Sequence, residues 1–129
     1  MLKVTHRELI DRALAEIETL DIEQAEALLE DDNTLFVDLR DPRELQREGK
    51  IPNAFHAPRG MLEFWVDPSS PYHKEVFASG KKLVFYCQSG WRSALSTKTV
   101  QDMGLDNVCH IGDGYRGGKD SGAATEDLS

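Results

Sequence analysis

The stretch "VFYCQSGWRSA", residues 84–94, decides the fold because its character changes in the middle. It opens as an apolar run, which is typical of a strand buried on both faces of a parallel sheet. Cys87 ends that run, and two small polar residues, a glycine, a tryptophan and an arginine follow. After Ser93 the pattern is helical. We therefore expect a strand, a tight loop and a helix in succession.

Strand-like and helix-like segments alternate along the rest of the chain. Strands are expected over "TLFVDLR", "KLVFYC" and "NVCHI", with shorter ones at 54–57 and 17–20. Helices are expected over 5–18, from 21 onward, over 41–49, around 73–78 and over 92–103. This alternation predicts an α/β protein with right-handed crossovers and a parallel sheet. Cys87 then lies at the carboxyl end of a strand, where such sheets bind ligands.

Length and composition restrict the class of protein. The chain has 129 residues, enough for one domain, and a formal net charge of −8. An acidic surface argues against nucleic-acid or membrane binding, but it permits a local anion site. The first twenty residues contain no signal-peptide pattern, and no segment is apolar enough to span a membrane. We expect a cytoplasmic protein whose two cysteines remain thiols.

The loop after Cys87 has the composition of an anion-binding nest. Backbone N–H groups at the start of the following helix are unpaired, and Gly90 permits the positive φ of a compact loop. Arg92 adds a fixed positive charge, and the same field stabilises a thiolate at Cys87. Nucleophile and anion site would then share one loop, and no histidine base is required. The alternative interpretation is a structural cysteine beside a solvated arginine.

Three segments resemble the rhodanese family of sulfurtransferases over roughly residues 21–122. They are "VDLRDPRELQREGKIPNAFHAP", "VFYCQSGWRSA" and "MGLDNVCHIGDGYRG", in the family's order and spacing. The first is similar to the family's Asp-x-Arg segment with Glu44 and the turn at 49–52. The second resembles the active-site loop, and the third resembles the last strand with its glycine turn.

The resemblance implies a central parallel sheet of about five strands flanked by helices on both faces. It also implies that Cys87 takes a sulfane sulfur from a thiosulfate-like donor, carries it as a persulfide, and passes it to a thiol or cyanide-like acceptor. Arg92 would bind the donor's anionic end and brace the loop. The rest of the loop would bind substrate: Gln88, Ser89, Gly90, Trp91 and Ser93.

The length of the loop separates two chemistries. Four residues lie between Cys87 and Arg92, whereas cysteine phosphatases and arsenate reductases on the same fold resemble Cys-x₅-Arg. The shorter loop favours sulfur over phosphate. A phosphatase or arsenate reductase remains the weaker alternative. A non-enzymatic persulfide carrier that docks on a protein partner remains the stronger one.

Other residues have supporting or open roles. Asp38 and Arg40 are expected to form an ion pair, Arg40 pairing with Asp38 or Glu44, or else to support the loop electrostatically. Arg59 could reach the site, although a surface charge is the simpler interpretation. Trp91 is either an exposed docking residue or a lid, and Cys109 is either a resolving thiol or a buried one. No cofactor is expected, and the histidines have no metal-ligand spacing.

The sequence departs from the family's pattern at three positions. Lys50 replaces a histidine, Asp113 replaces a glycine, and Gly118 stands where a tryptophan is expected, so the last helix could be short, loosely docked or absent. We expect a single monomeric domain over 1–129, with a helical extension at 1–20 and a flexible tail at 119–129. The physiological donor and acceptor, including a protein acceptor, stay open.

Overall fold

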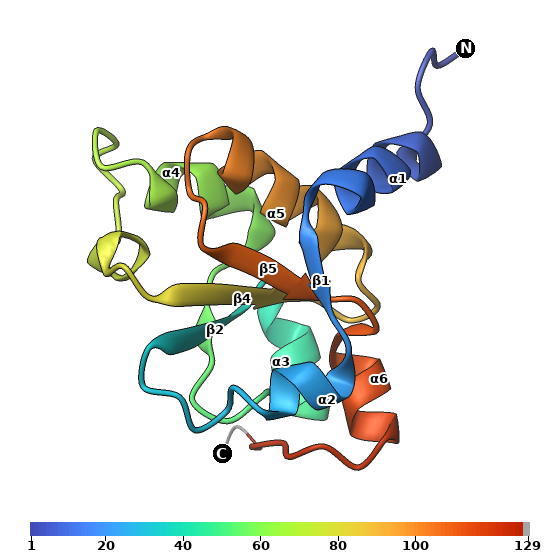
Figure 1. Cartoon of the computed structure of the whole chain (residues 1–129), viewed down its shortest axis with the longest axis vertical. Helices are drawn as coiled ribbons and strands as arrows, with labels where there is room; N and C mark the ends of the chain where they lie inside the picture. The colour runs from blue at the N-terminus through green and yellow to red at the C-terminus, as the bar shows by residue number, and fades with distance from the viewer. Residues whose placement is uncertain (128–129) are drawn as a thin grey trace.

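The computed structural model, which describes residues 1–127, is built around one five-stranded parallel sheet (Figure 1). The strand order is β1-β5-β4-β2-β3, and all four neighbouring pairs run parallel. The strands are β1 (Glu18–Leu20), β2 (Thr34–Asp38), β3 (Phe55–His56), β4 (Lys82–Tyr86) and β5 (Val108–Ile111). The expected α/β fold with about five strands is confirmed.

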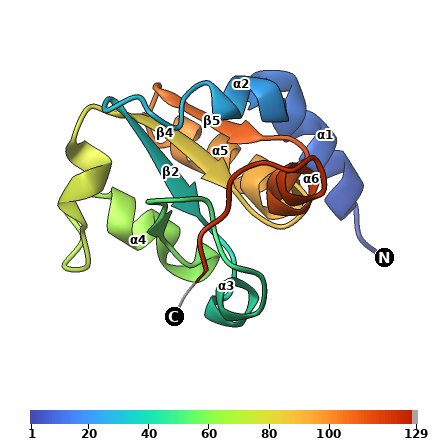
Figure 2. The same cartoon turned by 90° about the horizontal axis from the view of Figure 1, so that it is seen from below.

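Helices cover both faces of the sheet (Figures 1 and 2). One face carries α1 (His6–Glu16), α4 (Leu62–Val66) and α5 (Trp91–Asp102), and the other carries α2 (Ile22–Glu26), α3 (Pro42–Glu48) and α6 (Gly114–Asp120). Two short 3₁₀ helices, η1 (Arg59–Met61) and η2 (Glu75–Ala78), flank α4 in the chain. The predicted helix around 73–78 is thus a single 3₁₀ turn.

Local sequence signals set the helix starts. The Thr5 side chain accepts a hydrogen bond from the N–H of Glu8, and Asp21 and Gln24 form a reciprocal capping box. Asp41 caps α3 in the same way with Glu44, and Pro42 occupies the first helical position. These caps confirm the starts that the sequence predicts.

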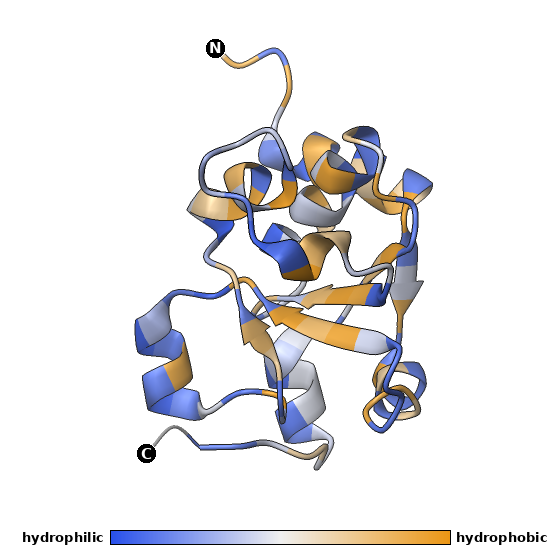
Figure 3. Ribbon diagram, turned by 90° about the vertical axis from the view of Figure 1, so that its left-hand side faces the viewer, coloured by the Kyte–Doolittle hydropathy of each residue, from blue (hydrophilic) through white to orange (hydrophobic). Residues whose placement is uncertain are grey.

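The two faces of the sheet bury separate apolar clusters, and the strands form the hydrophobic centre in Figure 3. Val37, Phe85 and Val108 pack with α4 and α5, whereas Phe36, Val84 and Cys109 pack with α2 and α6. β4 lies third in the five-strand order, with its last four residues buried. A nucleophile after β4 therefore rests on the most rigid part of the fold.

The inward face of α5 combines apolar and hydroxyl residues. Ala94 and Val100 are buried there beside Ser96 and Thr97, each of which donates to a carbonyl four residues earlier. Met103 follows the helix as its C-cap and is 45% exposed.

The last helix is short and docked. Tyr115 of α6 is 2% exposed and stacks on Tyr86, so the exchange at Gly118 does not remove the helix. Beyond α6, Glu126 and Lys50 exchange two backbone hydrogen bonds. Flexibility of the 119–129 segment stays a prediction, and its residues 128–129 lie outside the described part. Within residues 1–127 no helix is long and apolar enough to cross a membrane.

Candidate active site

Cys87 directly follows β4, and the next residues turn sharply into α5. Gly90 precedes α5 with φ of +98° in the left-handed region. A Cβ at Gly90 would collide with the carbonyl oxygen of Gly112, in the turn after β5. The loop is thus folded tightly against the neighbouring strand end, and glycine is required there for both conformation and space.

The sulfur of Cys87 is enclosed by donors from this loop. The N–H groups of Gly90 and Ser93 point at Sγ, with N–S distances of 3.2 and 3.4 Å. The thiol in turn donates to Ser93 Oγ at 3.6 Å, and the Ser93 hydroxyl donates to the carbonyl of Gly90 at 3.2 Å. Because the two N–H donors sit at the positive end of α5, they can stabilise a negative charge on the sulfur. Cys87 as a whole is only 1% exposed.

A buried histidine extends this set of contacts. Nδ1 of His110 lies 2.9 Å from Ser93 Oγ, and its Nε2 lies 3.0 Å from Thr19 Oγ1 on β1. His110 is 1% exposed, and burial lowers its pKa to about 4. The imidazole is therefore neutral near physiological pH.

Arg92 is tied to a carboxylate beside the loop. Its two terminal nitrogens each lie 2.9 Å from an oxygen of Glu44, in a bidentate pair. The hydrogen bond from Arg92 holds the pKa of Glu44 below its ordinary value. The Arg92 side chain remains 41% exposed, so its charge reaches the site mouth but is partly neutralised.

Arg40 forms a fully buried ion pair with Asp38. Of the two partners expected for Arg40, Asp38 and Glu44, the structure therefore shows Asp38. The guanidinium of Arg40 also donates to the side-chain oxygen of Gln88, at 3.1 Å, and to the carbonyl of Gly49. Gln88 in turn donates to Glu48 at 2.8 Å, and this hydrogen bond holds the pKa of Glu48 below its usual value. The Arg40 pair therefore braces the loop through Gln88, a side chain that the sequence had assigned to substrate.

α6 holds the loop from the other side. The N–H of Tyr115 donates to the carbonyl of Cys87 at 2.8 Å, and the N–H of Arg116 donates to that of Gln88 at 3.1 Å. Gly114 has φ of +69°, and a Cβ there would lie 2.8 Å from the Cys87 carbonyl oxygen. Loop carbonyls are thus paired with α6 while the amides of Gly90 and Ser93 face the sulfur.

The remaining predicted residues lie around this centre. Trp91 is 48% exposed, and its ring contacts His6 (5.2 Å between ring centroids) and the guanidinium of Arg7 (5.2 Å) on α1. Ser89 is exposed at the loop tip. Arg59 is half-buried and pairs with Glu63 at 2.9 Å.

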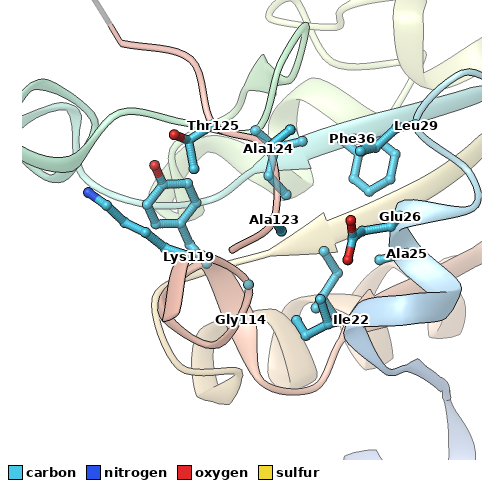
Figure 4. A pocket seen from close by; sticks show the side chains of 14 residues that line it. Ile22, Ala25, Glu26, Leu29, Phe36, Gly114, Lys119, Ala123, Ala124 and Thr125 are labelled. Atoms are coloured by element: carbon cyan, nitrogen blue, oxygen red, sulfur yellow. The ribbon is translucent and has the colours of Figure 1, made fainter. Parts of the chain in front are cut away.

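The apolar cavity in Figure 4 lies beneath the tail rather than at the sulfur. It measures about 30 Å³ and is bounded by α2, α6 and residues 123–125. Ile22, Phe36 and Tyr115 are among its lining residues, whereas none of residues 87–93 is. No cluster of three metal-ligating side chains occurs in residues 1–127.

The comparisons with known proteins agree with this geometry. The model of the rhodanese-like domain matches residues 21–121, and the chain belongs to this family. Mouse thiosulfate sulfurtransferase/rhodanese-like domain-containing protein 3 is 24% identical over 98 residues, which cover 72% of this chain and 62% of that protein. The chain thus spans about 62% of the length of this curated relative.

Two solved structures extend the similarity to the N-terminal segment. A Rhodopseudomonas palustris protein of unknown function, described as a possible tyrosine phosphatase, is 48% identical with a TM-score of 0.95, covering 98% of this chain and 97% of that chain. The polysulfide-sulfur transferase homodimer of Wolinella succinogenes is 27% identical with a TM-score of 0.69, covering 93% and 85%. The family and its sulfurtransferase neighbours support a sulfur-transfer role at the level of the family.

Sequence reasoning missed three residues around the loop. His110 on β5 contacts Ser93, Thr19 on β1 contacts His110, and Glu48 on α3 accepts from Gln88. One signal was available: His110 is the last but one residue of a predicted strand, and parallel strands place their carboxyl ends together. The register confirms this, because Phe85 of β4 lies opposite His110.

Proposed function

We propose that the protein is a rhodanese-type sulfurtransferase with Cys87 as its nucleophile. The observation that carries this proposal is the cradle of Gly90 and Ser93 amides around Sγ at the start of α5. The four-residue spacing to Arg92 makes this cradle compact, which suits the single atom of a sulfane sulfur. Membership of the rhodanese-like family supports the same chemistry.

The reaction would proceed in two balanced displacements. The Cys87 thiolate attacks the outer sulfur of thiosulfate, a sulfur–sulfur bond forms to Cys87, and sulfite leaves with the electron pair of the broken bond. The terminal sulfur of the persulfide anion is then attacked by a thiolate or cyanide, and the Cys87 thiolate is released. The Gly90 and Ser93 N–H groups stabilise the sulfur anion in both steps.

The enclosure of Cys87 restricts the donors. Because the residue is only 1% exposed, a donor must present a narrow sulfur end-on, as thiosulfate and polysulfide chains do. The exposed Trp91 beside the loop offers a contact for a protein-borne acceptor, which keeps the carrier function as a variant of this proposal. A reducing compartment such as the cytoplasm suits a cysteine that must remain a thiol.

A phosphatase is the second candidate because the similar Rhodopseudomonas palustris protein is described as a possible tyrosine phosphatase. A phosphate ester needs a wider cradle and an arginine free to grip two oxygens. Here both terminal nitrogens of Arg92 are engaged by Glu44. Sulfur transfer is therefore the better-supported chemistry. If the natural protein hydrolysed an aryl phosphate faster than the Cys87→Ser variant does, the phosphatase would become the better-supported function.

The proposal is tested by incubating the full chain with thiosulfate and measuring the intact mass. We expect the mass of one added sulfur, its removal by cyanide, and no gain in Cys87→Ser. Cys109→Ser is the matched control and should gain sulfur like the natural protein. A folded protein that gains no sulfur from thiosulfate or polysulfide would contradict the proposal.

A further inference from the structure

A continuous chain of polar contacts leads from the enclosed sulfur to the outer edge of the sheet. It runs from Cys87 Sγ to Ser93 Oγ (3.6 Å), to His110 Nδ1 (2.9 Å), and from His110 Nε2 to Thr19 Oγ1 (3.0 Å). Cys87 and His110 are each 1% exposed, whereas Thr19 is exposed on the edge strand β1. Hydroxyls and neutral imidazoles can donate at one side and accept at the other.

We propose that Ser93, His110 and Thr19 carry the thiol proton of Cys87 to solvent. Once the proton has left, His110 acts as a positioning residue, because it holds the Ser93 hydroxyl as a donor to the sulfur anion. The inference rests on the proposed function only in taking the Cys87 thiolate as the working form. It concerns how that thiolate arises and is held, a question that the loop amides alone do not answer.

The proton transfers balance without any net change on His110. Before transfer, Cys87 S–H donates to Ser93 Oγ and Nε2–H donates to Thr19 Oγ1. The Ser93 O–H is directed at Nδ1, 2.9 Å away, rather than at the carbonyl of Gly90, 3.2 Å away. Each group then passes its proton one position along, and the Thr19 hydroxyl releases one to water. Afterwards the new Ser93 O–H donates to the thiolate, Nδ1–H donates to Ser93, and Nε2 accepts from Thr19. The imidazole changes tautomer and stays neutral.

The surroundings of His110 favour a neutral relay over an imidazolium. Burial lowers its pKa to about 4, which disfavours the charged form near neutral pH. It meets a hydroxyl from α5 and one from β1, and Phe85 faces it on β4. Among residues 1–127, burial is the one cause found for the lowered pKa of His110, whereas the charges of Glu18 and Lys82, which pair at 3.0 Å, act on the neighbouring Cys109.

The surroundings of Cys87 are different, because a charge lies close to its sulfur. The charge of Cys87 contributes to raising the pKa of Arg92, after the hydrogen bond with Glu44. The buried Asp38–Arg40 pair faces the loop from β2 through Gln88. The thiol proton must leave for the sulfur anion to form, and the path leads it to Thr19 on the edge strand β1.

Thr19 lies outside residues 21–121, the part that matches the family model. The outer end of the path is therefore supplied by this chain's own N-terminal segment, through the pairing of β1 with β5.

The direct test follows the tautomer of His110 by ¹⁵N NMR of the full chain labelled at histidine. Imidazole nitrogen shifts report which nitrogen carries the proton. Between about pH 5 and about pH 10, where cysteines ionise, we expect the proton to move from Nε2 to Nδ1 in step with Cys87 ionisation. In Cys87→Ser the tautomer should not change over this range. A constant tautomer in the natural protein would overturn the proposal.

A second test measures alkylation of Cys87 by iodoacetamide near neutral pH, read by peptide mass. Loss of one hydrogen bond to a sulfur anion predicts about tenfold slower alkylation in His110→Phe. His110→Asn keeps an N–H donor toward Ser93 and should recover part of this loss. Thr99→Val, which removes a hydroxyl elsewhere on α5, is the control and should react like the natural protein.

The two proposals fail separately. Equal alkylation rates in a folded His110→Phe variant and the natural protein would contradict the positioning role, and the NMR test does not depend on that variant folding. Neither measurement uses a sulfur donor. A protein with the expected tautomer change that never gains sulfur would overturn the proposed function alone.

Discussion

Cys109 lies in β5 and Cys87 directly follows the neighbouring strand β4. The two are almost equally buried, at 0% and 1% exposure, yet their sulfurs meet opposite surroundings. The sulfur of Cys87 faces two N–H donors and a hydroxyl. The sulfur of Cys109 faces the carbonyl of Leu83 at 3.9 Å, an acceptor that disfavours an anion. Burial raises the pKa of the Cys109 thiol to about 11.

The difference between the surroundings of the two sulfurs follows from where each cysteine lies relative to its strand. Cys109 lies inside β5, where the backbone amides are engaged in the sheet with β1 and β4. Cys87 comes one residue after β4, where the chain turns and the first amides of α5 are unpaired by the helix. Burial alone therefore gives an inert thiol, whereas burial at a strand end before a helix supplies the N–H donors that the proposed nucleophile requires.

The largest expected effect is the difference in alkylation between the two thiols. A thiol with a pKa of about 11 is ionised in about one molecule in ten thousand near neutral pH. In the native protein we expect iodoacetamide to modify Cys87 at least about a hundredfold faster than Cys109. In denaturant the two rates should become equal. Similar native rates, measured by peptide mass, would remove the distinction drawn between the two sites.

The second effect concerns His110, which follows Cys109 in the chain but faces the loop of Cys87. Its pKa is 6.5 when unfolded and about 4 in the folded protein, so only the unfolded chain binds this proton between those values. Stability should therefore fall as the pH drops from 6.5 toward 4, by up to about 3 kcal/mol. Urea unfolding of His110→Asn should lack this part of the pH dependence. If the free energy of unfolding changed with pH in the same way in the natural protein and in His110→Asn, a buried neutral imidazole at His110 would be contradicted.

Local patterns predicted most of the fold and the centre of the site. The apolar run before Cys87 predicted β4, and the caps at Asp21 and Asp41 predicted the starts of α2 and α3. Gly90 and the following helix predicted a nest of amides at the sulfur. These features depend on residues close together in the chain, which is why the sequence reveals them.

The contacts made across strands were not predictable in this way. His110 reaches Ser93 because β5 lies beside β4, and Thr19 reaches His110 because β1 pairs with β5. Nothing local shows that Arg92 pairs with Glu44 while Arg40 pairs with Asp38, since both carboxylates were available to Arg40. Such choices depend on the strand order, which puts β2 beside β4 and so brings Glu44 near the start of α3 within reach of Arg92 near the start of α5.

The third effect separates the conformation of Gly90 from its close approach to Gly112. Gly90→Ala adds both a strained positive φ and a backbone collision, so we expect at least about 2 kcal/mol of destabilisation and slower alkylation of Cys87. Gly104→Ala is the matched control, with φ of +116° and open space around its Cβ. It should lose about 1 kcal/mol and leave alkylation unchanged. Equal effects on alkylation in both variants would show that the turn does not shape the sulfur site.

The smallest effect concerns Arg92, the charge next to Cys87. Glu44→Gln keeps an acceptor for the N–H of Asp41 at the start of α3 but removes the negative charge that holds Arg92. The released guanidinium should lower the KM for thiosulfate about two- to fivefold, with little change in kcat, because a partly exposed ion pair contributes about 1 kcal/mol or less. The gain should shrink as salt is added. Glu63→Gln, which frees Arg59 instead, is the control and should leave KM unchanged. An unchanged KM in Glu44→Gln would mean that Arg92 braces the loop without binding the anionic donor.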